Sequence, residues 1–303
     1  MHYFLSRNVK LAALAIFACI SLFVTDIIAS ESVMHMHFEL NDTSVPMANV
    51  EINGKRQELM IDTGSQNALH LTKEFMGQLS GLEIDPEKER STDLTGKVFL
   101  NDRFHIPQLT INGMMFKDIQ GVSLTPWGMN LIGEDRLPSS MVIGLGLFKG
   151  KAVLIDYKSQ RLSVADHPQS LSVDAADWIA LPLRLTQEGI VVRVSQRMQG
   201  YNMVLDTGAS VSVFWKNRIK PPFAGISCRV VMVEMENEGC MASEFQLGEI
   251  GAEGIKLNAV LMDGAFENVD MDGVIGNDFF ERFAVLIDFP GQRLLIKENI
   301  LPR

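Results

Sequence analysis

Two copies of the tripeptide Asp-Thr-Gly are the strongest chemical signal in the sequence. One is Asp62-Thr63-Gly64 and the other is Asp206-Thr207-Gly208, and each follows three apolar residues. A single copy would be interpreted as a polar β-turn, because residues of these types are common in turns. Two copies in matching contexts indicate instead a pair of carboxyl groups that act together.

Paired carboxyl groups suit the hydrolysis of a peptide bond. Two carboxyls about 3 Å apart cannot both ionise, so they share one proton. The charged group acts as a base toward water, and the protonated group donates to the substrate oxygen. Asp62 and Asp206 are therefore the predicted catalytic pair. The threonine hydroxyls are expected to hydrogen-bond across to the opposite loop, and the glycines to allow close packing of the two turns. The predicted supporting residues are Thr63, Gly64, Ser65, Thr207, Gly208 and Ala209.

The chain also repeats itself. Val153–Leu162 recurs as Val285–Leu294 with seven of the ten positions identical, at a separation of 132 residues. At the same separation, Val142-Ile143-Gly144 matches Val274-Ile275-Gly276. Together with the two Asp-Thr-Gly motifs, these are three matching blocks in the same order, which predicts a duplicated unit.

Both units have the pattern of β-structure. Short apolar or alternating runs such as Ala48–Ile52 end in turn residues, and Asn112-Gly113 between two such runs predicts a hairpin. The expected fold class is all-β and bilobal, with two duplicated barrel-like lobes and the active site between them. The predicted divisions are residues 31–166 for the first lobe, 167–177 for a linker and 178–303 for the second lobe.

These motifs resemble those of the pepsin and retropepsin superfamily of aspartic proteases. The resemblance is closest to bacterial aspartyl proteases in which two retropepsin-like units are fused in tandem. It implies that the blocks ending at Gly144 and Gly276 thread behind the active-site loops as psi-loops. It also implies flaps near Thr92–Lys97 and Asn237–Met241, with Gly96 and Gly239 at the bends. A polypeptide substrate would lie in the cleft, and neither a cofactor nor a metal is expected.

The sequence departs from pepsin in two respects. The flap stretch contains no tyrosine, and Ser65 is matched by Ala209, as in retropepsins. Ser65 can donate a hydrogen bond to the charged form of its aspartate, whereas Ala209 cannot. We therefore expect an asymmetric pair whose upper apparent pKa lies above that of a pepsin-like pair, and activity at mildly acidic to near-neutral pH.

The first thirty residues have the pattern of a secretory signal peptide. Arg7 and Lys10 precede the apolar stretch Leu11–Val24, which is the usual order of such segments. Asp26 interrupts the stretch before the roughly 20 residues that a spanning helix needs. The expected location is the periplasm or cell envelope, and the alternative is an uncleaved inner-membrane anchor facing the periplasm.

Export would place the last two cysteines in an oxidising compartment. Cys228 and Cys240 could then pair. A ladder that paired these cysteines would have its turn midway between them, whereas the turn signal at Asn237–Gly239 lies closer to Cys240. The alternative therefore remains that the two cysteines are small, buried hydrophobic residues.

Composition limits the remaining functions. The apolar fraction of 47% and the charged fraction of 21% are those of a globular protein. A net charge of −10 repels phosphate backbones, which argues against a nucleic-acid partner. One chain supplies both aspartates, so a monomer is expected. The alternative function is that of a non-catalytic peptide-binding protein with a protease-like fold.

Four other side chains in the sequence could take part in chemistry. His35 and His37 lack a third ligand in the sequence, so they do not predict a metal site. His70 is interpreted as structural. Trp127 is either a pocket-lining residue or a packed loop aromatic.

Overall fold

Strands dominate the chain, as the sequence predicts. The computed structural model describes residues 33–92, 98–126, 139–223, 225–228, 240–248, 254–263 and 269–299, all within the unit Ser32–Arg303. Their strands form one sheet of thirteen strands and one of eight. The α-helices in these ranges are single turns, α1 (Lys73–Met76) and α2 (Asn277–Phe280). The predicted signal segment lies outside the described residues.

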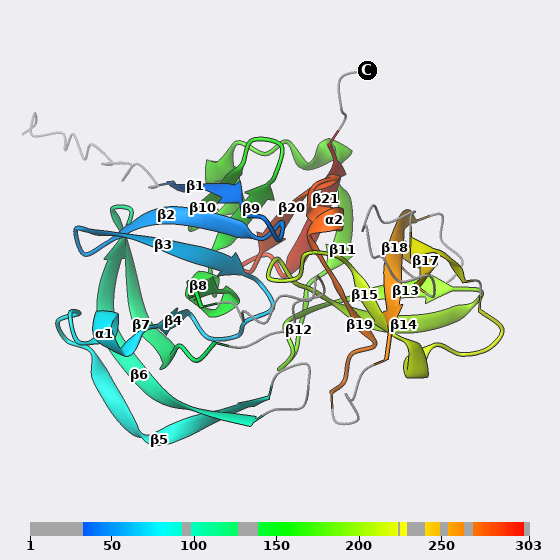
Figure 1. The fold of residues 1–303 in the computed structure, drawn as a ribbon. Coiled ribbons are helices and arrows are strands. Elements are labelled where there is room, and N and C mark those ends of the chain that lie inside the picture. The colour runs from blue at the N-terminus through cyan, green and yellow to red at the C-terminus, as the bar shows by residue number, and fades with distance from the viewer. Residues whose placement is uncertain are drawn as a thin grey trace, which may run out of the picture. The chain divides into compact units, whose positions relative to one another are not determined.

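Six strands of the larger sheet close into a barrel (Figure 1), because β2 pairs with both β3 and β6. In ladder order they are β2 (Pro46–Ile52), β3 (Lys55–Asp62), β8 (Met141–Gly144), β4 (Leu69–Leu71), β7 (Met114–Ser123) and β6 (Val98–Ile111). A further strand, β5 (Glu83–Thr92), forms a long hairpin with β6. Along β2, Ala48, Val50 and Ile52 are buried while Asn49 and Glu51 are exposed. This alternation points one face of the strand into the barrel core.

A second barrel closes in the same way within the smaller sheet, where β13 pairs with both β14 and β17. Its strands are β13 (Ile190–Gln196), β14 (Gln199–Leu205), β19 (Gly273–Ile275), β15 (Val213–Trp215), β18 (Ile255–Met262) and β17 (Met241–Leu247). The short strands β12 (Arg184–Leu185) and β16 (Ile226–Ser227) lie at the two ends of this sheet. The two barrels provide the bilobal architecture expected from the sequence.

The rest of the larger sheet joins strands from the start, the middle and the end of the described chain. In order they are β11 (Ile179–Pro182), β21 (Arg293–Glu298), β20 (Phe283–Asp288), β9 (Ala152–Asp156), β10 (Arg161–Ala165) and β1 (Met34–Leu40). The strands β9 and β20 are antiparallel neighbours, with Leu154 directly opposite Leu286 (Figure 1). These two leucines occupy the same position of the repeated ten-residue block. An antiparallel ladder centred on matching residues is the pairing that a two-fold axis through this point would give.

Turn chemistry accounts for the hairpins. Asn53 and Gly54 have φ values of 47° and 81°, and Asn112 and Gly113 have values of 45° and 80°. Two consecutive positive φ angles are the mark of the type I′ turn that Asn-Gly favours.

The segment predicted as a linker, 167–177, contains two short 3-10 turns, η2 (Pro168–Leu171) and η3 (Ala175–Asp177). Beyond them the chain enters β11, which pairs with β21 near the end of the chain.

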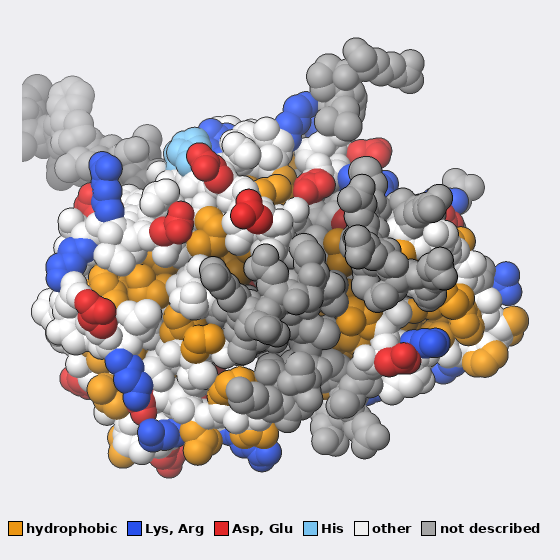
Figure 2. Space-filling model, in the orientation of Figure 1, with side chains coloured by type: hydrophobic (Ala, Val, Ile, Leu, Met, Phe, Trp, Pro, Cys, Tyr) orange, Lys and Arg blue, Asp and Glu red, His pale blue; other side chains and the backbone are white. Residues whose placement is uncertain are grey.

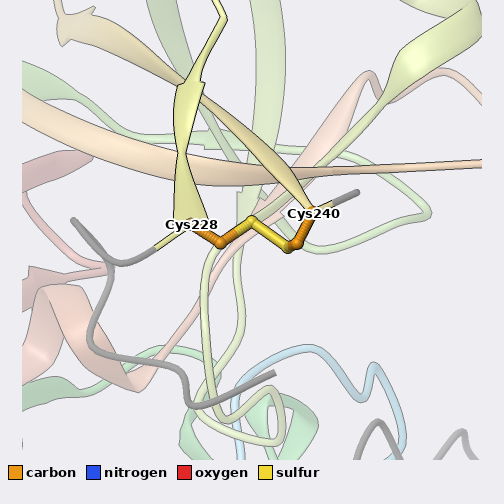
Figure 3. Close-up of a disulfide and its surroundings, with 2 residues drawn as sticks. All are labelled: Cys228 and Cys240. Carbon is orange, nitrogen blue, oxygen red and sulfur yellow. A yellow bond between two sulfur atoms is a disulfide. The ribbon is translucent and has the colours of Figure 1, made fainter. Parts of the chain in front are cut away.

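Cys228 and Cys240 form a disulfide (Figure 3), with their Cα atoms 5.6 Å apart. In the ladder between β16 and β17, Ile226 faces Ala242 and Ser227 faces Met241. Continuing this register by one residue places Cys228 opposite Cys240. The objection drawn from the turn signal at residues 237–239 was wrong, since the ladder register does bring these cysteines together.

Within the described residues, no helix is both long and apolar enough to cross a membrane. On the face drawn in Figure 2, acidic and basic side chains of the described residues are interspersed rather than gathered by sign.

Candidate active site

Each aspartate of the predicted pair lies at the carboxyl end of a central barrel strand. Asp62 is the last residue of β3, and Asp206 directly follows β14. Both strands have neighbours on each side, β2 and β8 for β3 and β13 and β19 for β14. Their apolar residues are buried, which explains why three apolar residues precede each motif. Asp62 is 2% exposed.

The threonines of the two motifs join the lobes. The Thr63 hydroxyl donates to the Leu205 carbonyl at 2.9 Å, and the Thr207 hydroxyl donates to the Ile61 carbonyl at 2.7 Å. Each hydroxyl also accepts from the backbone amide of the other threonine, at 3.0 and 3.1 Å. Both threonines are buried. These crossed hydrogen bonds are the ones expected from the sequence.

The same turns bring the two carboxyl groups together. A β-carbon built on Gly208 would lie 2.9 Å from Oδ1 of Asp62 and 3.1 Å from Oδ1 of Asp206, so the two carboxyl groups border the same small space. A β-carbon built on Gly64 would lie 2.6 Å from Cγ of Asp206, and one built on Gly208 would lie 2.9 Å from Cγ of Asp62. Each carboxyl therefore packs against the glycine of the opposite turn, where any larger residue would collide with it.

Backbone amides hold the carboxyls in place. Oδ1 of Asp62 accepts from the amides of Gly64 at 2.8 Å and Ser65 at 3.2 Å. Oδ1 of Asp206 accepts from the amide of Gly208 at 2.8 Å. These donors stabilise a negative charge, so the site can carry one ionised carboxyl without a metal or a lysine beside it.

Burial and the neighbouring carboxyl set the protonation of the pair. Burial, followed by the charge of Asp206, raises the pKa of Asp62 well above its ordinary value. Burial also raises the pKa of Asp206, while hydrogen bonds from Asp62 and from backbone amides work in the opposite direction. The pair consequently holds one proton over a range of pH.

The two apolar-apolar-Gly blocks thread behind the turns. Gly144 follows Ile143 at the end of β8, and its amide donates to the Ala68 carbonyl at 3.0 Å. A β-carbon on Gly144 would lie 2.1 Å from the Asn67 carbonyl oxygen, and one on Gly276 would lie 2.5 Å from that of Val211. Only glycine fits in either place, which is the close backbone approach that the resemblance implied.

Ser65 differs from its expected role. Its hydroxyl is 2.6 Å from Nε2 of His70, and its backbone amide rather than its hydroxyl contacts Asp62. The hydroxyl therefore does not make the hydrogen bond to Asp62 that was expected from the sequence. The reason is the position of β4, which places the His70 imidazole beside the turn. His70 is buried, and burial lowers its pKa to about 4.

A second polar network reaches the site from the turn after β9 and was missed in the sequence. The Tyr157 hydroxyl donates to Oδ1 of Asn277 at 2.6 Å, and Nδ2 of Asn277 donates to the Thr207 carbonyl at 3.0 Å and the Ser44 carbonyl at 2.6 Å. The hydroxyl of Ser210 donates to the Thr43 carbonyl. The turn after β1 is thereby fastened to the second Asp-Thr-Gly loop. The sequence signal for this network is Tyr157, because the second copy of the repeated block has Phe289, without a hydroxyl, at the matching position.

The structure does not place the remaining predicted residues at the dyad. Gly96, Gly239 and Trp127 are outside the described residues, although β5 and β6 do form the hairpin that leads to residues 93–97. The side chain of His35 lies on β1, where Nδ1 is 2.9 Å from the Ser163 hydroxyl.

The comparisons with known proteins rest on structure. No protein-family model and no curated protein sequence matches the chain. The basic 7S globulin from soybean superposes with a TM-score of 0.56 at 11% identity, covering 88% of this chain and 95% of that one. An aspartic proteinase from Irpex lacteus superposes with a TM-score of 0.52 at 13% identity, covering 89% of this chain and 98% of that one. The chain therefore has the bilobal, all-β fold of the aspartic proteinases.

Proposed function

We propose that the protein is an aspartic endopeptidase in which Asp62 and Asp206 activate a water molecule between them. The observation that carries the proposal is the packing of these two carboxyls at one junction, with Asp62 buried and Asp206 half-buried, each held by backbone amides and faced by the glycine of the opposite turn. Two carboxyls held in this way contain one exchangeable proton, which is the requirement for acting as base and acid in a single step.

The one proton of the pair supplies both roles. The ionised carboxyl takes a proton from the attacking water, and the protonated carboxyl donates its proton to the carbonyl oxygen of the scissile bond. The attack forms the C–O bond and moves the carbonyl electron pair to the oxygen that is protonated. Collapse of this tetrahedral intermediate breaks the C–N bond and re-forms the carbonyl. The proton taken from water goes to the leaving amine, and a hydroxyl proton of the intermediate returns to the carboxyl that first donated one.

Binding without catalysis is the second candidate. The fold is shared by a globulin as well as by a proteinase, so fold similarity alone does not decide between them. The arrangement of the carboxyls favours catalysis. Burying two acids against each other is unfavourable, and a surface that only bound an extended peptide through backbone hydrogen bonds would not need it.

The proposal extends to the substrate, the oligomeric state and the location of the protein. The substrate is an extended polypeptide, no cofactor or metal is used, and one chain suffices as a monomer. Residues 1–30 direct export to the periplasm or cell envelope, and residues 31–166 and 178–303 are two retropepsin-like lobes, as in the bacterial tandem enzymes. Interspersed surface charges (Figure 2) and a net charge of −10 support a protein partner over nucleic acid.

The test is hydrolysis of a peptide library by the purified chain, with and without a statine-type inhibitor whose hydroxyl replaces the attacking water. Asp62→Asn and Asp206→Asn should each abolish hydrolysis while the protein stays folded. Asp278→Asn is the matched control, because Asp278 is a largely buried carboxyl whose pKa burial raises to about 6 but which accepts from Ser212 instead. Hydrolysis that survives both dyad substitutions would end the proposal, and peptide binding without hydrolysis would favour the second candidate.

A further inference from the structure

His70 is a buried polar residue in a strand that is otherwise apolar. It is the middle residue of β4, between Leu69 and Leu71, which are fully buried in the main core. Its partners in the neighbouring strands are Val142 on β8 and Val122 on β7. A histidine in such surroundings lowers stability unless its ring nitrogens are hydrogen-bonded. Nε2 has such a partner in the hydroxyl of Ser65.

Ser65 links this histidine to the dyad. Its hydroxyl contacts His70, its amide donates to Oδ1 of Asp62, and its carbonyl accepts from the Leu145 amide at 2.8 Å. The orientation of the amide toward Asp62 is thus determined partly by what the hydroxyl contacts. A residue that holds the hydroxyl holds the amide as well.

The second half of the chain shows that the fold does not require this polar pair. Val142 and Val274 are matching positions of the repeat, and β15 pairs Val213 with Val274 as β4 pairs His70 with Val142. Val213 is therefore the counterpart of His70, and Ala209 is the counterpart of Ser65. Val213 lies in an apolar cluster against which Ala209 packs. The hydroxyl and the imidazole occur together in one half and are both replaced by apolar groups in the other.

From this difference, we propose that His70 is a positioning residue which, through Ser65, orients the backbone donor to Asp62 and makes the two carboxyl groups inequivalent. The inference rests on the proposed function, since it concerns the same dyad. Burial is the cause of the lowered pKa of His70, about 4, so the imidazole is neutral in the expected working range. A neutral imidazole can accept from the hydroxyl or donate to it, and either contact fixes the serine.

The repeat itself supplies the test variant. Ser65→Ala combined with His70→Val copies the pair found in the second half and removes the hydroxyl and the imidazole together, so it should fold. His70→Gln retains an amide nitrogen near the position of Nε2 and serves as the conservative variant. His70→Val alone leaves the serine hydroxyl without the imidazole. All three are compared with the wild-type chain for thermal unfolding and for the pH dependence of kcat/KM.

The double variant should unfold within a few degrees of wild type, keep KM within about twofold and lose about tenfold in kcat, because the altered contact is to a reacting group rather than to the bound peptide. One limb of its pH profile should move by at least about half a pH unit, and His70→Gln should restore most of both changes. A double variant with the wild-type profile and kcat would show that the pair is only structural and would overturn the proposal.

A second readout separates this proposal from the proposed function. Carbon-13 NMR of labelled aspartate carboxyls follows the titration of the dyad directly, with Asp62→Asn and Asp206→Asn spectra providing the assignment. If the wild-type chain hydrolyses no peptide but the dyad of the double variant titrates differently from that of wild type, the positioning role is retained and the protease function is rejected. If the wild-type chain does hydrolyse peptides but the dyad titrates identically in the double variant and in wild type, the positioning role alone is rejected.

Discussion

Thr63 and Thr207 exchange four hydrogen bonds across the junction of the lobes. Each hydroxyl donates to the carbonyl of the residue that precedes the opposite aspartate, and each accepts from the amide of the other threonine. The backbone on both sides of the dyad is therefore anchored by side chains of the opposite lobe. The distance between the carboxyl groups depends on this exchange as much as on either barrel.

Replacing a hydroxyl with a methyl group tests this exchange. Thr63→Val keeps the shape of the side chain but leaves the Leu205 carbonyl and the Thr207 amide buried without their partner. We expect a loss of about 2–6 kcal/mol in the free energy of unfolding, since each of the two orphaned groups lowers stability by about 1–3 kcal/mol. Urea denaturation measures it. Thr63→Ser retains the hydroxyl and should lose less than half as much, and equal losses in the two variants would contradict the hydrogen-bond explanation.

The glycines opposite the carboxyls make a second prediction. In Gly64→Ala the new methyl group would lie 2.6 Å from Cγ of Asp206, so the two acids must separate. A displacement of this kind should reduce kcat/KM by about 100-fold or more. Gly77→Ala is the matched control, because its methyl group would meet only ordinary contacts at 3.5 Å or beyond. If both alanine variants hydrolyse peptides equally well, the close approach is not needed for the chemistry.

The site divides into parts that the sequence could predict and parts that it could not. The dyad and its threonines follow from a local motif that occurs twice, so their meeting could be predicted without coordinates. The contact of His70 with Ser65 depends on which residue of β4 pairs with Val142. That register is set by the packing of the whole barrel. The disulfide was left open for a similar reason, since it depends on a ladder register that the local turn signal misjudged.

The raised pKa values of the dyad predict how stability varies with pH. A carboxyl whose pKa is higher in the folded than in the unfolded protein makes the folded state hold more protons, so the free energy of unfolding falls as pH rises above about 4. Asp62→Asn removes this effect. The variant should be more stable than wild type at pH 8, and the difference should shrink as the pH is lowered toward 4, the ordinary aspartate pKa.

Thermal unfolding of wild type and Asp62→Asn between pH 4 and pH 8 measures this difference. Asp278→Asn provides a comparison, because burial raises the pKa of Asp278 to about 6. Its advantage over wild type should therefore level off above about pH 6. A difference that does not change with pH would mean that burial does not raise the pKa of Asp62.

Tyr157, which follows β9, is linked to the second Asp-Thr-Gly loop through Asn277. Tyr157→Phe removes one hydroxyl and keeps the ring, which packs on Phe38 and Phe280 at centroid distances of 4.9 and 5.6 Å. We expect a loss of about 1–2 kcal/mol in the free energy of unfolding, because Oδ1 of Asn277 would lose its buried donor. Urea denaturation is again the measurement. The repeat places Phe289 at the matching position, so a phenylalanine itself is compatible with this turn, and an unchanged stability would show that Asn277 does not need the tyrosine.

The disulfide should stabilise the second barrel by restricting the unfolded chain. Cys228 and Cys240 are separated by 12 residues, and closing a loop of this length is worth about 3 kcal/mol. Reduction of the wild-type protein should lower its free energy of unfolding by about this amount, measured by urea denaturation with and without reductant. Replacing both cysteines by alanine should give a protein that reductant does not affect. Because Cys228 is buried, this variant also loses side-chain volume in the core, so it should be slightly less stable than the reduced wild type. If wild type, shown by thiol titration to be fully reduced, kept its original stability, then the ladder between β16 and β17 would hold this segment without the covalent bond.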